Sequence, residues 1–249
     1  TDLLLHADTS KAIPALVEAV EEAMTEADRA RAMERFQVIE GRHQRQRESA
    51  VKLAESHASR PSITPEWLSH CIGEVIGEDT VLLDECVTNS ATVASYVRRS
   101  QPGTYYKSGG SSLGWALGAA LGAKLAEPER TVATTVGDGA FIYGCPTSTL
   151  WAADAHDAPF LTIIYNNQLH NAVKRSLKAG YPDSHSDRTN NWVGMELSPS
   201  VDFAMLARAC RAYGETVEEP DQVKPALERG LEQVRSGVAA VLDVRIERP

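Results

Sequence analysis

The 249-residue sequence lacks several features that would place it in a common class of protein. It has no unbroken run of about 18 apolar residues, which a membrane-spanning helix requires. Its opening residues, TDLLLH, lack the basic, apolar and small-residue segments of a secretory signal. Basic residues are also in deficit, with 25 Lys and Arg against 34 Asp and Glu, a formal net charge of −9. We therefore expect no membrane span, no export signal, and neither nucleic acid nor an anionic membrane as partner.

Cysteine is scarce, and the four cysteines are far apart: Cys71, Cys86, Cys145 and Cys210. Without a Cys-x-x-Cys pair, they indicate reduced thiols in a cytoplasmic protein. No internal repeat or low-complexity segment occurs, and no Gly-x-Gly-x-x-Gly follows the first expected strand, which argues against a Rossmann-type NAD site. The remaining composition, 43% hydrophobic and 24% charged, is ordinary for a chain that builds a core.

Two short apolar runs, at 131–136 and 160–165, each end in a polar motif. Gly-Asp-Gly at 137–139 follows the first run, and Asn-Asn at 166–167 follows the second. The runs are rich in β-branched residues and bounded by turn residues, which predicts two buried parallel strands. The Ala/Leu/Trp pattern at 147–157 predicts a helix between them. In such a β-α-β unit both motifs lie at the carboxyl edge of the sheet, where open α/β sheets bind ligands.

The residues in these motifs suit a metal ion and a diphosphate. Glycines on both sides of Asp138 allow backbone N–H groups to approach phosphate oxygens closely. Asp138 and an asparagine, Asn166 or Asn167, supply the hard oxygen ligands that Mg²⁺ takes beside phosphate and water. Each motif alone is also a common turn, but the two motifs at neighbouring strand ends indicate a cofactor site.

With residues 140–165 between them, the two motifs resemble the cofactor signature of thiamine-diphosphate (ThDP) enzymes. The resemblance is closest to the acetolactate synthase and benzoylformate decarboxylase branch. It implies that Mg²⁺ is held by the side chains of Asp138 and Asn167 and by the backbone carbonyl of Leu169. It also implies that the diphosphate lies against the backbone of 137–140 and 168–171, which adds to the site Gly137, Gly139, Ala140, His170 and Asn171.

Two further segments complete the cofactor site in this resemblance. The loop 84–90 reaches the diphosphate, which makes Thr88 a contact and Cys86 or Val87 weaker candidates. Thr88 and the two residues after it serve equally well as an N-cap of the helix expected at 91–99. In the segment 108–124, Leu113 is implied to be the apolar wedge under the cofactor, while the carbonyl of Ser111 accepts from the aminopyrimidine. Alternatively, the glycines at 114, 118 and 122 only allow close helix packing, which is the better explanation for the second half of this segment.

Candidate substrate contacts are His170 and residues of the loop 178–192. His170 could move protons near pH 7, although a pocket-lining histidine without that role is the reading we favour. The polar loop 178–192 contains glycine and proline, as lids often do. His185 and Arg188 in that loop could meet a substrate carboxylate if it closes. A surface loop without function is the simpler alternative.

The rest of the chain predicts an α/β fold with a doubly wound, mostly parallel sheet flanked by helices at 61–249, preceded by a helical linker. Helices are expected at 64–76, 91–99, 201–213 and 221–235, and further strands at 80–84, 215–217 and 238–246. Residues 1–60 differ from this pattern. They predict a strand at Leu3–His6, a helix at Lys11–Met24 with Pro14 near its first turn, and a long polar helix at Glu26–Ser56. The resemblance implies that this part is the tail of a middle domain and a linker helix.

ThDP enzymes of this branch activate the cofactor with a glutamate from a separate pyrimidine-binding domain, and residues 1–60 hold no candidate for it. We therefore expect the chain to be the diphosphate half of an enzyme, either as a subunit or as a fragment. The resemblance implies decarboxylation or carboligation of a small 2-oxo acid by a homo- or hetero-oligomer. Two alternatives remain open: a lyase or carboligase that acts on aldehydes without an oxo-acid step, and a catalytically silent ThDP-binding or assembly subunit.

Overall fold

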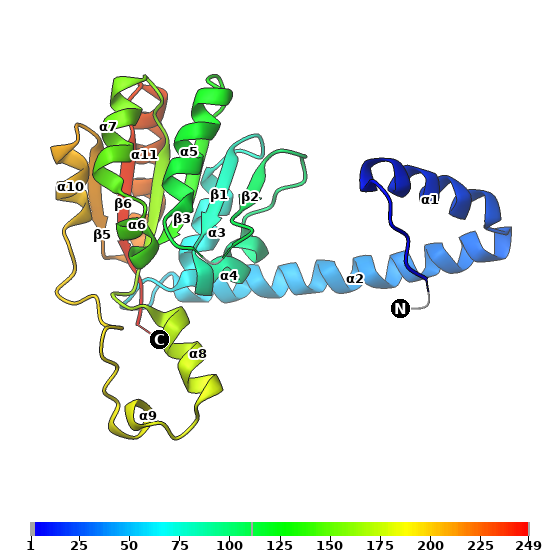
Figure 1. Ribbon diagram of the computed structural model, residues 1–249, viewed down its shortest axis with the longest axis horizontal. Helices are drawn as coiled ribbons and strands as arrows, with labels where there is room; N and C mark the ends of the chain where they lie inside the picture. Colours follow the sequence, from blue (N-terminus) through cyan, green and yellow to red (C-terminus); the bar gives the residue numbers. More distant parts are fainter. Residues whose placement is uncertain (1–2, 111, 249) are drawn as a thin grey trace. The chain divides into compact units, whose positions relative to one another are not determined.

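The computed structural model describes residues 3–110 and 112–248 of the chain (Figure 1). The chain forms two compact units, one that reaches to Ser49 and one that starts at Ala50. The second unit contains the β-sheet and all the residues that are buried in the described part of the chain. The domain boundary near residue 60 that the sequence suggests stays a prediction.

Six parallel strands form the sheet, in the order β2-β1-β3-β4-β6-β5 (Figure 1). The strands are β1 (Val81–Glu85), β2 (Tyr105–Lys107), β3 (Val132–Gly137), β4 (Leu161–Asn166), β5 (Tyr213–Val217) and β6 (Ala240–Arg245). The four inner strands are buried along almost their whole length, as a parallel sheet covered on both faces requires. The predicted doubly wound α/β fold is confirmed, and every pairing between these strands is parallel.

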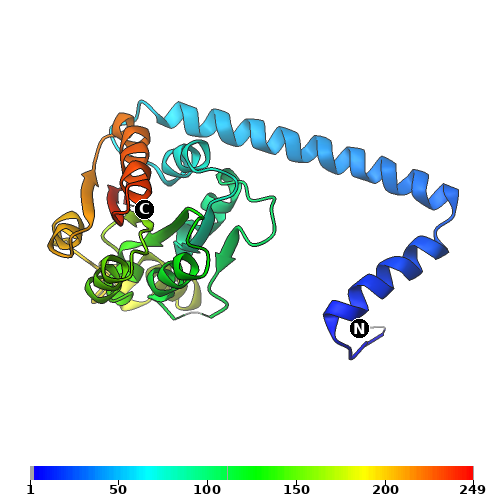
Figure 2. The same cartoon turned by 90° about the horizontal axis from the view of Figure 1, so that it is seen from above.

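Helices cover both faces of the sheet (Figure 2). One face carries α3 (Pro65–Val75), α4 (Ser90–Tyr96) and α11 (Val223–Arg235). The other face carries α5 (Trp115–Ala126), α7 (Pro146–Ala155) and α10 (Phe203–Ala209). Leu82 and Ile163 enter the first core, while their chain neighbours Leu83 and Ile164 enter the second. Alternate residues of each strand therefore fill two cores, and the carboxyl ends of the strands are left to build a site.

Several elements of the described chain are not predicted by the sequence patterns. They include β2 and the helices α6 (Asp138–Tyr143), α8 (Asn171–Gly180) and α9 (His185–Thr189). β2 has only three residues, and α6 begins on the Gly-Asp-Gly motif itself. The expectation of a plain loop at 178–192 is wrong, because α8 (Asn171–Gly180) enters it and Ser184 caps α9 by accepting the Asp187 N–H at 3.3 Å.

The N-terminal part of the chain forms α1 (Thr9–Ala23) and α2 (Glu26–His57). α1 begins two residues earlier than predicted, because the Asp8 side chain accepts the Ser10 N–H at 2.9 Å and caps the helix. The strand predicted at Leu3–His6 is wrong, since these residues are exposed and pair with no strand in the described chain. No helix among the described residues has both the length and the apolar composition to cross a membrane.

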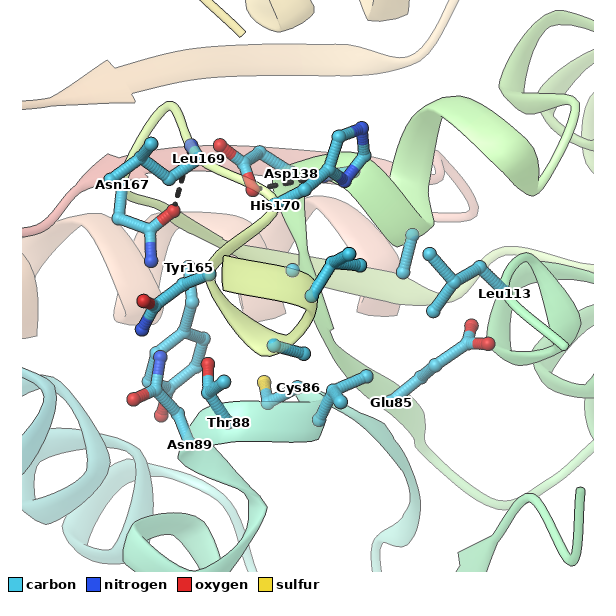
Figure 3. Close-up of a pocket in the computed structure, with 17 residues that line it drawn as sticks. Glu85, Cys86, Thr88, Asn89, Leu113, Asp138, Tyr165, Asn167, Leu169 and His170 are labelled. Carbon is cyan, nitrogen blue, oxygen red and sulfur yellow. Dashed lines mark hydrogen bonds between the residues drawn. The ribbon is translucent and has the colours of Figure 1, made fainter. Parts of the chain in front are cut away.

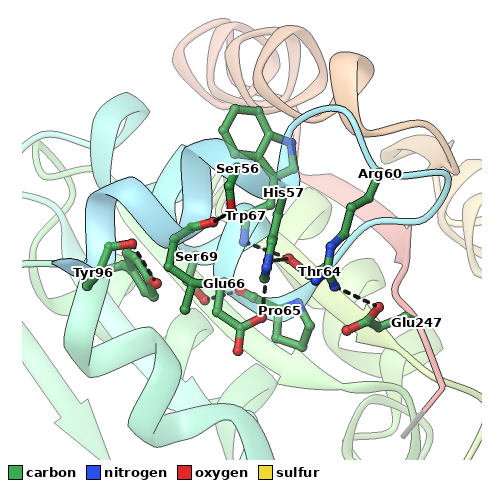
Figure 4. Close-up of polar contacts among 12 residues, drawn as sticks. Ser56, His57, Arg60, Thr64, Pro65, Glu66, Trp67, Ser69, Tyr96 and Glu247 are labelled. Carbon is green, nitrogen blue, oxygen red and sulfur yellow. Dashed lines mark hydrogen bonds and ion pairs between the residues drawn. The ribbon is translucent and has the colours of Figure 1, made fainter.

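The last turns of α2, from Ala50 onward, belong to the second unit and are held in place around His57 (Figure 4). Tyr96 Oη donates to the Ala50 carbonyl at 3.0 Å, and His57 Nδ1 lies 2.9 Å from Thr64 Oγ1. Thr64 Oγ1 also accepts the Trp67 N–H at 3.1 Å, so it caps α3 as the sequence predicts. One polar cluster therefore stabilises both the end of α2 and the start of α3.

Close packing does not explain the glycines in the middle of α5. A Cβ atom at Gly118 or Gly122 would meet no neighbouring segment of the described chain within 4 Å. A Cβ atom at Gly114 would lie only 2.4 Å from the carbonyl oxygen of Tyr143, and Gly114 has φ 100°. The expectation of close packing at these glycines therefore holds at the turn before the helix and is wrong within it.

Candidate cofactor site

A pocket lies at the carboxyl ends of β1, β3 and β4 (Figure 3). It is lined by Glu85, Cys86, Val87, Thr88, Asn89, Leu113, Gly137, Asp138, Gly139, Ala140, Tyr165, Asn167, Leu169, His170, Asn171, Ala172 and Val173. The β3 and β4 motifs therefore meet at one edge of the sheet, as parallel strands dictate. The loop after β1 and the turn before α5 form the rest of the wall.

Asp138 is the most informative side chain in this pocket. It is 3% exposed, and its Oδ1 accepts the Gly139 N–H at 2.9 Å. Its other oxygen, Oδ2, is buried and accepts no hydrogen bond from the described residues. Burial raises the pKa of Asp138, against the opposing effect of nearby backbone N–H groups and of His170. A buried carboxylate oxygen without a partner is costly, and a cation at this point would satisfy it.

At the end of β4, the side chains of Asn166 and Asn167 make different contacts. Asn166 Nδ2 donates to Asp243 Oδ1 at 2.7 Å and to Ser200 Oγ at 3.2 Å, behind the pocket. Asn167 lines the pocket, and its Oδ1 accepts the Leu169 N–H at 3.0 Å. One lone pair of Asn167 Oδ1 is thus used within the turn, and the second is available to a ligand.

The last strand and the residues after it hold this turn from outside. Arg248 Nε donates to the Asn167 carbonyl and Arg248 Nη2 to the Gln168 carbonyl, both at 3.2 Å, and Arg248 also pairs with Glu196. The His170 N–H donates to the Met195 carbonyl at 2.8 Å. These contacts leave the Leu169 backbone beside the pocket, where the resemblance requires a carbonyl.

Gly139 leaves room for the His170 ring in the position that it takes in this structure. A Cβ atom at position 139 would lie 2.6 Å from both Cε1 and Nδ1 of the His170 ring. His170 therefore covers the start of α6, next to Asp138. A Cβ atom at Gly137 would have nothing within 4 Å in the described chain, so crowding does not explain that glycine.

The donor set fits a hard cation with a phosphate ligand. Carboxylate, amide and carbonyl oxygens are available from Asp138, Asn167 and Leu169, and Mg²⁺ prefers such oxygens. The described residues contain no group of three or more His, Cys, Asp or Glu that could bind a metal. The oxygens of Asp138, Asn167 and Leu169 therefore fit Mg²⁺ better than Zn²⁺, which is commonly bound by Cys and His.

The structure gathers almost all of the predicted cofactor residues around this pocket. Ten line it: Thr88, Leu113, Gly137, Asp138, Gly139, Ala140, Asn167, Leu169, His170 and Asn171. Ser111 lies outside the described residues. His185 and Arg188 belong to α9 and do not line the pocket. Their substrate role stays a prediction.

The charged residues Glu85 in the pocket wall, and Asp243 and Arg248 behind it, are among those for which the sequence predicts no role. Glu85 ends β1, and its carboxylate accepts three backbone N–H groups at the start of α5. Asp243 is a fully buried charge within the apolar stretch AAVLDV, which is the signal in the sequence that could have revealed it. Arg248 contacts the β4 turn only through backbone carbonyls, so no local sequence pattern predicts that contact.

Known proteins share both this sequence pattern and this fold. The family described as thiamine pyrophosphate enzyme, C-terminal TPP binding domain, matches residues 86–244. The acetolactate synthase isozyme 3 large subunit of Escherichia coli (strain K12) is 27% identical over 194 residues, which cover 78% of this chain and 32% of that protein. The sulfoacetaldehyde acetyltransferase of Rhodobacter capsulatus is 27% identical over 196 residues, with the same coverage of 78% and 32%.

A solved structure supports the same assignment. The Rhodococcus jostii RHA1 thiamine diphosphate-dependent 4-hydroxybenzoylformate decarboxylase has a TM-score of 0.67 and 26% identity, covering 76% of this chain and 34% of that chain. The chain thus spans about a third of the length of the curated relatives that it matches. Since the family match takes in more than half of the sequence, including the loop after β1 and the strands β3 and β4 with their motifs, the chain belongs to the thiamine pyrophosphate enzymes and carries their C-terminal TPP-binding domain.

Proposed function

We propose that the chain binds ThDP through a Mg²⁺-bridged diphosphate and is one half of a 2-oxo acid decarboxylase or carboligase. The observation that carries this proposal is Asp138 Oδ2, a buried carboxylate oxygen without a partner among the described residues, at the carboxyl end of β3. Asn167 and Leu169 line the same pocket and supply the other oxygens. Burying this oxygen without a partner costs free energy, and coordination of a cation would offset that cost.

The pocket residues predicted from the sequence each have a defined task in this proposal. Asp138, Asn167 and the Leu169 carbonyl hold Mg²⁺. The backbone N–H groups of Gly139, Ala140 and residues 168–171 hold the diphosphate, with Thr88 beside it. Leu113 supports the rings, and His170 screens the diphosphate end from water. When bound, ThDP supplies a nucleophilic thiazolium carbon and an electron sink for the substrate carbonyl.

The chain requires a pyrimidine-binding partner for turnover under this proposal. The relatives are about three times as long as the matched region, which leaves ample sequence for that partner domain. The activating glutamate would come from there, either in the same polypeptide or in a second subunit. We expect a homo- or hetero-oligomer, and the four free cysteines fit a cytoplasmic protein.

The substrate class is a small 2-oxo acid or an aldehyde. Two of the relatives are named for products or substrates of 2-oxo acid chemistry, an acetolactate synthase and a 4-hydroxybenzoylformate decarboxylase. The third is named for sulfoacetaldehyde, which favours carboligation or lysis without an oxo-acid step as the second candidate. A catalytically silent assembly subunit is the remaining alternative, and turnover by the chain without a partner would exclude it.

Calorimetric titration of ThDP into the purified chain tests the cofactor assignment. We expect binding with Mg²⁺ present and a loss of at least about tenfold in affinity with EDTA or in Asp138→Asn, which removes the charge from the metal ligand. Asp154→Asn, the same change at an exposed surface pair with Arg211, should bind like the wild type. Equal affinity in Asp138→Asn and the wild type would remove the metal assignment.

A further inference from the structure

Glu85 is a carboxylate in the pocket wall that neither metal nor diphosphate binding uses. It is the last residue of β1 and 5% exposed. Its Oε1 accepts the N–H groups of Gly114 at 2.9 Å and Trp115 at 3.1 Å, and its Oε2 accepts that of Ala116 at 2.9 Å. Both oxygens are therefore committed to the N-terminus of α5, and such charge-assisted bonds are strong.

The Glu85 carboxylate caps the N-terminus of α5, which no side chain of its own N-cap residue does. The N-cap residue is Gly114, which has no side chain to offer, and the helix has no side-chain cap of its own. The first N–H groups of a helix have no partners within it, and they favour a negative charge. Glu85 supplies that charge from the end of strand β1, 29 residues before Gly114 in the chain. The start of α5 is thereby fixed relative to β1.

Leu113 lies directly before this anchored turn and lines the same pocket. The turn packs closely on the end of α6 and requires glycine, because a Cβ atom at Gly114 would lie 2.4 Å from the Tyr143 carbonyl oxygen and the backbone has φ 100°. Figure 3 shows Glu85 and Leu113 together at one end of the pocket, with Asn167 at the other. The residues that follow Glu85, Cys86 to Asn89, line the wall between these ends.

We propose that Glu85 is a positioning residue that sets where Leu113 stands relative to the diphosphate end of the pocket. It does so by joining the end of β1 to the start of α5. The proposal rests on the proposed function, since it assumes that the rings of ThDP lie against Leu113. It assigns Glu85 no proton transfer, because both of its oxygens already accept backbone N–H groups.

The test compares two ligands on the purified full chain by calorimetry in the presence of Mg²⁺. ThDP probes the whole pocket, while inorganic pyrophosphate probes the metal and diphosphate end alone. Glu85→Gln loses the charge and part of the three-bond cap, so we expect ThDP affinity to fall about tenfold while pyrophosphate affinity changes less than about twofold. Glu127→Gln, the same change at the C-terminal end of α5, should alter neither.

A double-mutant cycle separates positioning from general damage. If Glu85 acts through Leu113, the losses in ThDP affinity for Glu85→Gln and Leu113→Ala will not add in the double variant. Glu85→Asp, which keeps the charge but withdraws it from α5, gives the same ligand-selective loss should Glu85→Gln fail to fold. Equal losses for both ligands, no loss in either Glu85 variant, or full additivity would overturn the proposal.

The wild-type chain distinguishes failure of this inference from failure of the proposed function. Binding of neither ThDP nor pyrophosphate with Mg²⁺ would remove the proposed function itself. Binding of both with equal affinity would leave the metal site standing and overturn the role of Leu113 and Glu85. Tighter binding of ThDP than of pyrophosphate is the result that the proposal requires.

Discussion

At the scale of single residues, two buried carboxylates govern the candidate site. Asp138 faces the pocket, and Asp243 stands behind it on β6, fully buried. Asp243 Oδ1 accepts from Asn166, and its Oδ2 lies 2.8 Å from Arg245 Nη2 without the alignment of a hydrogen bond. Burial raises the pKa of both, and each is thus less stable as a carboxylate in the fold than in water. Such charges are retained at the expense of stability, which is expected of a functional site.

Asp138→Asn should leave the ligand-free chain at least as stable as the wild type at neutral pH. The folded-state pKa of Asp138 is raised, so its contribution to stability is complete below the ordinary value of 3.8 and is lost as pH rises through the raised pKa. At neutral pH the ionised group therefore opposes folding, and an uncharged amide does not. Thermal unfolding without ligand measures this, and a marked drop in the Tm of Asp138→Asn would contradict it.

The same variant should lose the stabilisation that ThDP and Mg²⁺ give to the wild type. Ligands that bind only the folded state raise Tm by mass action. Asp138→Asn should therefore keep or raise the Tm of the ligand-free chain, and it should lower the Tm of the chain with ThDP and Mg²⁺ bound. Asp154→Asn serves again as control, and equal ligand-induced shifts in both variants would mean that Asp138 holds no metal.

Asp243 predicts a pH dependence of stability. Burial raises its pKa from 3.8 to about 6, while the Asn166 hydrogen bond and Arg245 oppose the shift and the nearby Asp138 and Asp202 add to it. Its contribution to stability is complete below 3.8 and lost as pH rises through about 6. Between about pH 4.5 and about pH 7.5 the wild type should therefore lose about 2 kcal/mol relative to Asp243→Asn. Urea unfolding at the two pH values measures the difference, and a gap that does not change with pH would refute it.

At the scale of elements, the sequence predicts the site-bearing strands because their signals are local. β3 and β4 are apolar β-branched runs, and each ends in a polar motif that the structure places at the same sheet edge. The strand predicted at Leu3–His6 fails because three consecutive leucines do not make a strand without a partner. β2 is missed because its residues, Tyr105 to Lys107, are half-buried or exposed and show no apolar run.

The supports of the site could not be predicted, for a different physical reason. Glu85 acts on a helix 29 residues later, and Asp243 acts on Asn166 from 77 residues away. A pattern read along the chain reports on neighbours within a helix turn or a strand, whereas these contacts exist only once the sheet has formed. Arg248 is still harder to foresee, because it recognises backbone carbonyls that every residue carries.

The close packing of α10 on β5 predicts that β5 tolerates no side chain at Gly214. A Cβ atom at Gly214 in β5 would lie 2.1 Å from the Ala204 carbonyl oxygen, which is backbone and cannot turn aside. Gly214→Ala should therefore destabilise the chain by about 1–3 kcal/mol through overpacking. Gly118→Ala in α5 has free space and should instead stabilise by up to about 1 kcal/mol through helix propensity. Chemical denaturation of the two variants checks the opposite signs, and a neutral Gly214→Ala would contradict the packing.

At the scale of the whole molecule, the chain spans about a third of the length of the relatives that it matches. Under the proposed function this pocket binds the metal and the diphosphate, and the described residues that line it include no carboxylate left to activate the pyrimidine. Glu85, the glutamate in the pocket wall, is occupied by α5. The supply of that group from a second domain is thus part of the proposed function.

The chain alone should not release CO₂ from a 2-oxo acid at a measurable enzymatic rate, even with ThDP and Mg²⁺ bound. The reason is that bound cofactor without its activating carboxylate lacks the group that assists deprotonation. Release of CO₂ from pyruvate or benzoylformate, followed in a coupled assay, measures this. Asp138→Asn is the control for cofactor-independent background, and turnover well above that background would show that no partner is needed.

We propose above that Asp138, Asn167 and Leu169 hold the metal of a ThDP complex. A crystal structure of the chain grown with ThDP and Mn²⁺, with anomalous diffraction from the manganese, tests it most directly. We expect one anomalous peak about 2.0–2.3 Å from Asp138 Oδ2, Asn167 Oδ1 and the Leu169 carbonyl oxygen, next to the diphosphate. Bound ThDP with the metal elsewhere, or an empty pocket at saturating cofactor, would contradict it.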